Sequence, residues 1–100
     1  MGRVELHQQL VDILGSNYVY YQPPESVKLT YPCIIYTVAR KIGVYGNNHR
    51  YFKGTGYTIT LVTTSVDDSR CAALEELPYC SFDRHYTSDN LHHYTYTIYI

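Results

Sequence analysis

The sequence contains no tryptophan, a single methionine and only three cysteines among its 100 residues. An odd number of widely spaced cysteines, at positions 33, 71 and 80, is typical of reduced thiols in a cytoplasmic protein and argues against a disulfide scaffold. No apolar run approaches the length of a membrane span, and the N-terminus lacks the basic start and apolar run of a signal peptide. We therefore expect a soluble protein that is made in the cytosol.

Charged residues are also few, and their balance is nearly neutral, with a formal net charge of −1. A dedicated nucleic-acid-binding protein normally needs a clearly basic surface to contact phosphates, so this balance argues against that class. The positive charge is nevertheless concentrated locally. Four cations lie between positions 40 and 53, a range without any Asp or Glu: Arg40, Lys41, Arg50 and Lys53.

Tyrosine is unusually abundant, with 13 copies. Its large ring and its hydroxyl tolerate partial exposure, which suits strand surfaces and subunit interfaces. A chain of 100 residues has the size of one ordinary domain and can bury a core without disulfides or a metal. We therefore expect a single domain over residues 1–100.

Residues 31–64 predict a central β-hairpin, because β-branched and aromatic residues fill both arms and glycines and asparagines gather between them. In the second arm Tyr57, Ile59 and Leu61 alternate with threonines, as in a strand with one buried face. The first arm is apolar on both faces. That pattern predicts helices over one face and a loop or a neighbouring chain over the other, with Ile35 or Tyr36 as the candidate subunit contact.

The remaining segments predict two helices and three strands. An amphipathic pattern over residues 2–14 indicates a helix, and capping residues at 65–68 precede a second helix that reaches Leu77. Strands are expected at residues 18–22, 81–87 and 92–100, the last two joined by a turn at 88–90. The order predicts an α+β fold: a mostly antiparallel four- to five-stranded sheet with two helices on one face and an extended β-hairpin.

The last hairpin holds the best candidates for metal or acid–base chemistry, namely Asp83, His85, Asp89, His92 and His93. Asp83 and His85, two residues apart, are predicted to share a strand face, whereas His92 and His93 point to opposite faces. No HExxH or Cys-x-x-Cys spacing is present. We therefore predict a polar hairpin with surface histidines, and we assign no metal, cofactor or catalytic residue.

Two other motifs give equally little support for catalysis. Cys80 has His85 as a nominal base, but it lies at an element junction where a buried structural thiol is the simpler interpretation. The glycines of Lys53-Gly54-Thr55-Gly56 lack the following helix that a phosphate loop needs. Neither motif predicts an enzyme.

The basic tip of the central hairpin is the stronger candidate site. Its cations are interleaved with aromatic residues, and the candidate contact residues are Arg40, Lys41, Tyr45, Arg50, Tyr51, Phe52 and Lys53. Such a surface can bind nucleic acid by charge and stacking, or an acidic protein surface by charge and aromatic anchoring. An ordinary solvated loop would have the same composition.

Two segments together resemble a known family. Val19-Tyr20-Tyr21-Gln22-Pro23-Pro24 leads to Tyr31-Pro32-Cys33-Ile34-Ile35-Tyr36, and the run from Leu77 to Tyr86, LPYCSFDRHY, leads to Asp89-Asn90-Leu91-His92-His93. These segments, with the element order and total length, resemble the tail-completion or tail-terminator proteins that join head and tail in long-tailed bacteriophages. The resemblance covers nearly the whole chain.

The resemblance implies a structural role in the virion. Proteins of this family form a ring, usually of six subunits, that caps the finished tail tube and meets the head connector while the genome passes through the lumen without specific binding. It implies no enzymatic residue and no cofactor, and it implies assembly in the bacterial host cytoplasm. A head-completion adaptor of the same neck is the main alternative. A small nucleic-acid-binding module and a small metal enzyme are the others.

Overall fold

The computed structural model describes residues 2–24, 26, 28–46, 49–64 and 69–100, with the backbone alone for residues 40–46 and 49–54. The element order is α1 (Arg3–Leu14), β1 (Val19–Tyr21), β2 (Cys33–Gly46), β3 (His49–Thr63), α2 (Ser69–Glu75), β4 (Cys80–Ser88) and β5 (Leu91–Tyr99). Each predicted helix and strand is present, and only the ends differ slightly from the prediction.

The strands form one five-stranded sheet in the order β1-β2-β3-β5-β4. The strand pairs are antiparallel except for β1 and β2, which run parallel. Parallel neighbours need a crossover connection, and here residues 22–32 supply it. The predicted α+β fold with a mostly antiparallel sheet is confirmed.

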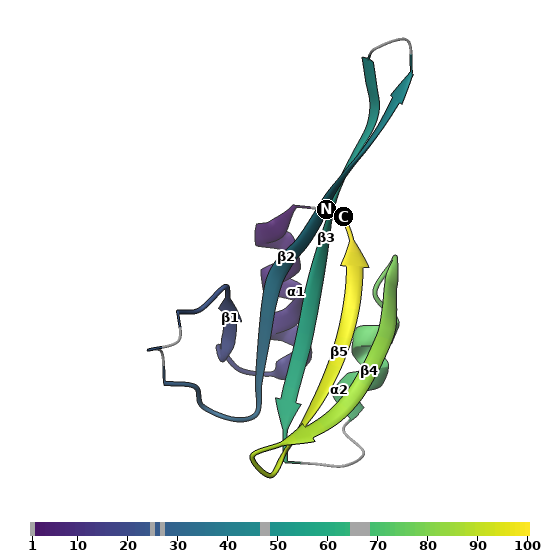
Figure 1. Ribbon diagram of the computed structural model, residues 1–100. Helices are drawn as coiled ribbons and strands as arrows, with labels where there is room; N and C mark the ends of the chain where they lie inside the picture. Colours follow the sequence, from purple (N-terminus) through teal and green to yellow (C-terminus); the bar gives the residue numbers. More distant parts are fainter. Residues whose placement is uncertain (1, 25, 27, 47–48, 65–68) are drawn as a thin grey trace.

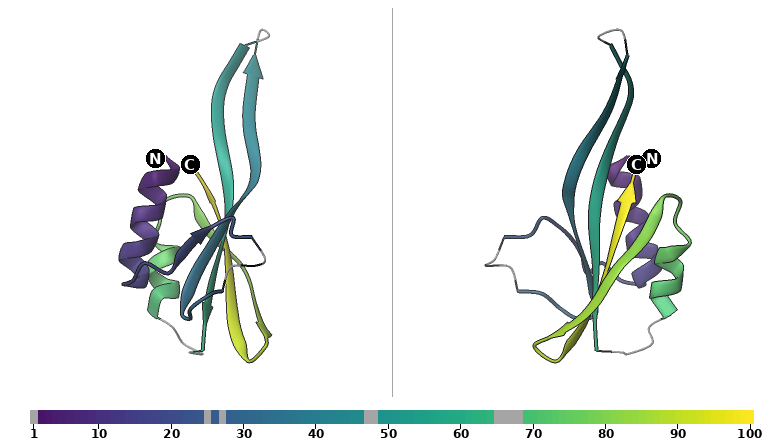
Figure 2. Two further views of the ribbon diagram at one scale, coloured as in Figure 1. Left: turned by 90° about the vertical axis from the view of Figure 1, so that its left-hand side faces the viewer. Right: turned by 45° about the vertical axis from the view of Figure 1, so that its right-hand side comes forward.

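Both helices cover the same face of the sheet, as Figure 2 shows. Helix α1 buries Leu6, Leu10 and Leu14, which recur every four residues and so form one stripe against the strands. Gly15 ends this helix in a left-handed conformation (φ 78°), and its N–H donates to the Val11 carbonyl oxygen. Helix α2 is shorter and buries Leu74. The predicted capping residues of α2, 65–68, lie outside the described residues.

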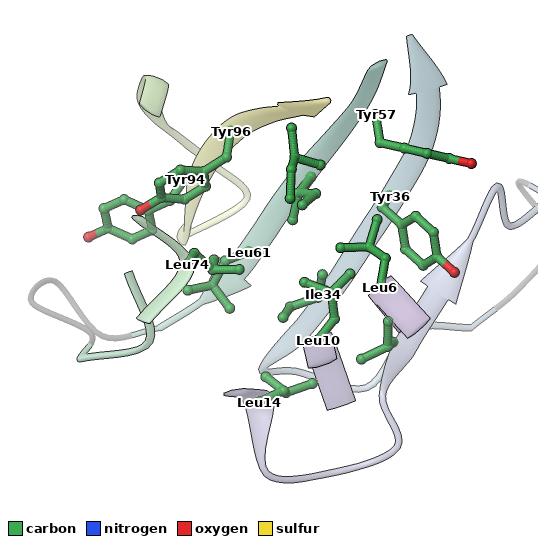
Figure 3. Packing of buried hydrophobic residues seen from close by; sticks show 13 residues of the cluster. Leu6, Leu10, Leu14, Ile34, Tyr36, Tyr57, Leu61, Leu74, Tyr94 and Tyr96 are labelled. Atoms are coloured by element: carbon green, nitrogen blue, oxygen red, sulfur yellow. The ribbon is translucent and has the colours of Figure 1, made fainter. Parts of the chain in front are cut away.

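The core lies between these helices and the sheet, and tyrosines are part of it (Figure 3). Tyr36 and Tyr96 have no exposed surface at all, although the composition predicts tyrosines for strand surfaces. A buried hydroxyl needs a hydrogen-bond partner. Tyr36 Oη has His7 Nδ1 at 2.7 Å, and Tyr96 Oη donates to the Cys71 carbonyl oxygen at 3.5 Å.

The central hairpin is longer than the sheet that supports it. Strand β5 pairs with β3 only as far as Gly56, and the final residue, Ile100, exchanges two backbone hydrogen bonds with Thr55. Beyond that point β2 and β3 continue as a two-stranded ribbon up to the pair Gly46 and His49. Figure 1 shows this ribbon, residues 40–54, projecting from the domain, and we call it the arm.

Candidate functional site

The face of the sheet opposite the helices carries a band of threonines. Along neighbouring strands Ile35 pairs with Thr60, which pairs with Thr95, and Thr37 pairs with Thr58, which pairs with Thr97. Thr95 is buried, whereas Ile35 and the other threonines are half-buried. We call these six residues and Tyr20, which pairs with Ile35 from β1, the helix-free face. This face is flat, mildly apolar and only partly covered by its own chain.

The structure separates the two predicted interface residues. Tyr36 faces the helices and is completely buried, so its side chain cannot reach a neighbouring subunit and its assignment as an interface residue is corrected. The reason is the strand pleat, which points Ile34 and Tyr36 into the core and Ile35 to the opposite face. Of the two candidates, only Ile35 lies on a surface that a second chain can contact.

The arm contains all seven predicted contact residues: Arg40, Lys41, Tyr45, Arg50, Tyr51, Phe52 and Lys53. Their side chains lie outside the described part of the molecule, but the backbone register is defined. Lys53 pairs with Gly43, Phe52 with Val44 and Arg50 with Tyr45, so Tyr51 is the additional residue at a shift in register. A second shift leaves Ala39 unpaired at the root of the arm. Extra residues of this kind bend a ribbon and increase its twist.

Two polar residues of α1 that the sequence gave no reason to single out lie against the root of the arm. Arg3 Nη1 donates to Tyr36 Oη at 3.3 Å, and the Arg3 guanidinium lies 4.5 Å from the centre of the Tyr21 ring. His7 shares the same Tyr36 hydroxyl. Burial, followed by the neighbouring Tyr21, raises the pKa of Tyr57, the last core tyrosine before the arm. These contacts fix the N-terminus of α1 to the strands that form the arm.

The histidines of the last hairpin contact one another and nearby aromatic rings. His85 Nε2 lies 3.0 Å from His92 Nδ1, and the His85 ring stacks on Tyr94 with 4.5 Å between ring centres. His93 stacks on Tyr86 instead, so His92 and His93 do point to opposite faces as predicted. Among the described residues no group of three or more His, Cys, Asp or Glu side chains is placed to hold a metal ion.

Asp83 and His85 do not share a strand face, so this prediction was wrong. The register shifts between Phe82 and Arg84, which makes Asp83 the additional residue of a bulge and reverses the alternation after it. Asp83 accepts a short hydrogen bond from the Thr97 hydroxyl on the helix-free side. His85 stacks on the core residue Tyr94 on the other side. Asp89 lies in the turn, with a left-handed backbone.

The three cysteines are free thiols, of which Cys33 is buried and the other two are half-buried. Burial raises the pKa of Cys33 to about 11. Burial also raises the pKa of Cys80 to about 11, with smaller contributions from the Asp83 and Glu75 carboxylates. Because the thiolate is the reactive form, both thiols are poor nucleophiles at neutral pH. His85, the nominal base for Cys80, hydrogen-bonds to His92 instead.

Comparison of the chain with protein-family models, with curated proteins and with solved structures found no match. Among the described residues no helix is both long and apolar enough to cross a membrane. The arguments about function therefore rest on the arm, on the helix-free face and on the family resemblance of the two sequence segments.

Proposed function

We propose that this protein is a structural component of the neck of a long-tailed bacteriophage. In this proposal it forms a ring, hexameric as in the family that it resembles, which terminates the tail tube and joins the tail to the head connector. The two resembling segments supply the identity of the family. The proposal assigns the protein to the virion and gives it no enzymatic activity and no cofactor.

The observation that carries the proposal is the division of the sheet into a covered face and a partly uncovered face. Ile35 is apolar and half-buried in the middle of the helix-free face. A small domain whose helices cover one face only can bury the other by packing against a copy of itself. Contact between two different surfaces of identical subunits closes into a ring when the rotation between neighbours permits.

The arm supports the same proposal from another side. It extends the longest strands of the sheet beyond the core, and it carries the only run of the chain in which four cations occur without an acidic residue. A basic ribbon on a nearly neutral subunit suits a contact with the tail-tube protein or the connector along the ring axis, or a position near the lumen through which DNA passes. Specific binding of free DNA is not part of this role.

The test is the native mass of the purified protein alone and after mixing with tail tubes of the same virus. We expect a ring that binds the tube end, and we expect tube growth to stop when the protein is added during polymerisation. In the virus, loss of the protein should give filled heads beside tails of abnormal length. A protein that stays monomeric with tubes and leaves their length distribution unchanged would exclude the terminator role.

A further inference from the structure

Strand β4 forms one edge of the sheet and pairs on one side only, with β5 (Figure 1). Residues Ser81–Ser88 are all exposed, and the two aromatic side chains Phe82 and Tyr86 are 47% and 40% exposed. The backbone N–H and C=O groups along such an edge can pair with another strand. An edge of nine residues is long for a domain of this size.

Protein edges are usually protected against pairing by proline, by lysine or by bulges. Strand β4 contains neither proline nor lysine, and its bulge at Asp83 affects only the first part of the strand. After the bulge the register with β5 is regular from Arg84 to Ser88. Its one cation, Arg84, lies over the Tyr86 ring at 5.1 Å, so the second half of β4 remains open to another strand.

A second open edge lies on the opposite side of the sheet. Strand β1 pairs with β2 only from Ile34 to Tyr36, and the Gln22 side chain accepts a hydrogen bond from the Val38 N–H. From Ala39 to Gly46 the outer edge of β2 has no neighbouring strand among the described residues. Because the two free edges lie on opposite sides of one sheet, pairing them would join copies head to tail.

The charges of the two edges are complementary. The arm, which contains the free edge of β2, carries four cations and no acid. Residues 67–89 carry six carboxylates and two arginines, Arg70 and Arg84, for a formal charge of −4. Glu75 and Glu76 are exposed at the end of α2, which packs beside β4. Glu75 and Asp83 both raise the pKa of Cys80, so their negative field reaches the start of β4.

We propose that the free edge of β4, over Arg84–Ser88, pairs with the free edge of β2, over Ala39–Gly46, in a second copy of this chain. The inference rests on the ring proposed above and specifies the contact that closes it. It makes one sheet continuous between neighbouring subunits, and it leaves β3 of the arm for the axial partner. Ile35, four residues before Ala39 on the same strand, lies next to this contact.

The first experiment exchanges charges between the two edges. Arg40→Glu with Lys41→Glu, and separately Glu75→Lys with Glu76→Lys, should each raise the protein concentration for half-assembly about tenfold or more, because like charges then face each other. The variant with all four substitutions should assemble again, because opposite charges are restored with the signs exchanged. Glu5→Lys, an exposed change on α1, is the matched control and should have no effect. Thermal melting of each variant checks the fold.

The second experiment measures amide hydrogen exchange of the wild-type protein before and after assembly, alone and on tail tubes. We expect new protection within residues 84–88 and 39–46. Assembly without protection there, or a four-substitution variant that fails to assemble although it folds, would overturn the edge contact while leaving the terminator role intact. Rings that show the protection but do not bind tubes would support the contact and exclude the terminator role. A protein that never assembles, alone or on tubes, would overturn both.

Discussion

The two faces of the sheet differ in what covers them and therefore in what a substitution on each would do. The helix-covered face contains side chains without any exposed surface, such as Ile34, Ile59 and Tyr96. The helix-free face consists mainly of half-buried threonines around Ile35. Since apolar burial contributes roughly 25 cal/mol per Å², the first face holds most of the folding free energy. The second is free to contribute to assembly, so the two properties should be separable by mutation.

The largest expected effect is loss of the last strand. Removing residues 96–100 deletes Tyr96 and Ile98 from the core, each worth roughly 1.5–3 kcal/mol, together with the strand that lies between β3 and β4. A domain of this size has only about 5–15 kcal/mol of stability, so the truncated protein should not fold. Circular dichroism against temperature is the measurement. An unchanged melting temperature would show that β5 is peripheral to the core.

A matched pair of substitutions on neighbouring residues compares the two faces directly. Tyr36→Asp puts a carboxylate in the core and removes a buried ring, and it should cost at least about 4 kcal/mol of folding free energy. Ile35→Asp should cost much less, because the new carboxylate remains half in water, but it should yield soluble monomers in place of rings. Denaturant unfolding and native mass measure the two effects. If Ile35→Asp assembled normally, the helix-free face would not be the subunit contact.

Shortening the arm should leave the domain folded. The core side chains lie before residue 39 and after residue 56, so deletion of residues 44–50 removes none of them. We expect a melting temperature close to that of the full chain together with loss of binding to the axial partner. An unfolded deletion variant would show that the arm belongs to the folding unit.

The smallest effect concerns pH and the buried thiol. Since burial raises the pKa of Cys33 from 9.0 to about 11, the unfolded chain loses this proton first as the pH rises. Stability from this group is therefore complete below pH 9 and declines between pH 9 and 11. Cys33→Ala should show a smaller decline than the wild-type protein in urea unfolding at these pH values. Equal declines would assign the effect to other groups, such as the tyrosines.

The sequence predicted the elements well because their patterns are local. The alternation of Tyr57, Ile59 and Leu61 with threonines is visible without any structure, and the same holds for the leucines of α1. Three features depend on partners that are distant in sequence and could not be predicted. They are the parallel pairing of β1, the bond of His7 to Tyr36 across 29 residues, and the bulge at Asp83, which no residue type in β4 signals.

The candidate site was predicted in part for the same reason. A strand that is apolar on both faces indicated a second cover, but the pattern alone did not say which of Ile35 and Tyr36 faces it. That choice depends on the face that α1 occupies. Had the position of α1 been known, the alternation along β2 would have been enough to select Ile35.

The hydrogen bond between Tyr36 and α1 has a mechanical consequence for the arm. Strand β2 is continuous from Tyr36 to Gly46, so a load applied to the arm is carried along its backbone to the ring that His7 and Arg3 hold. The arm works as a lever whose inner end is anchored in the helix layer, and the unpaired Ala39 lies at its fulcrum. A tug on the arm is therefore transmitted to the first turns of α1 on the far side of the sheet.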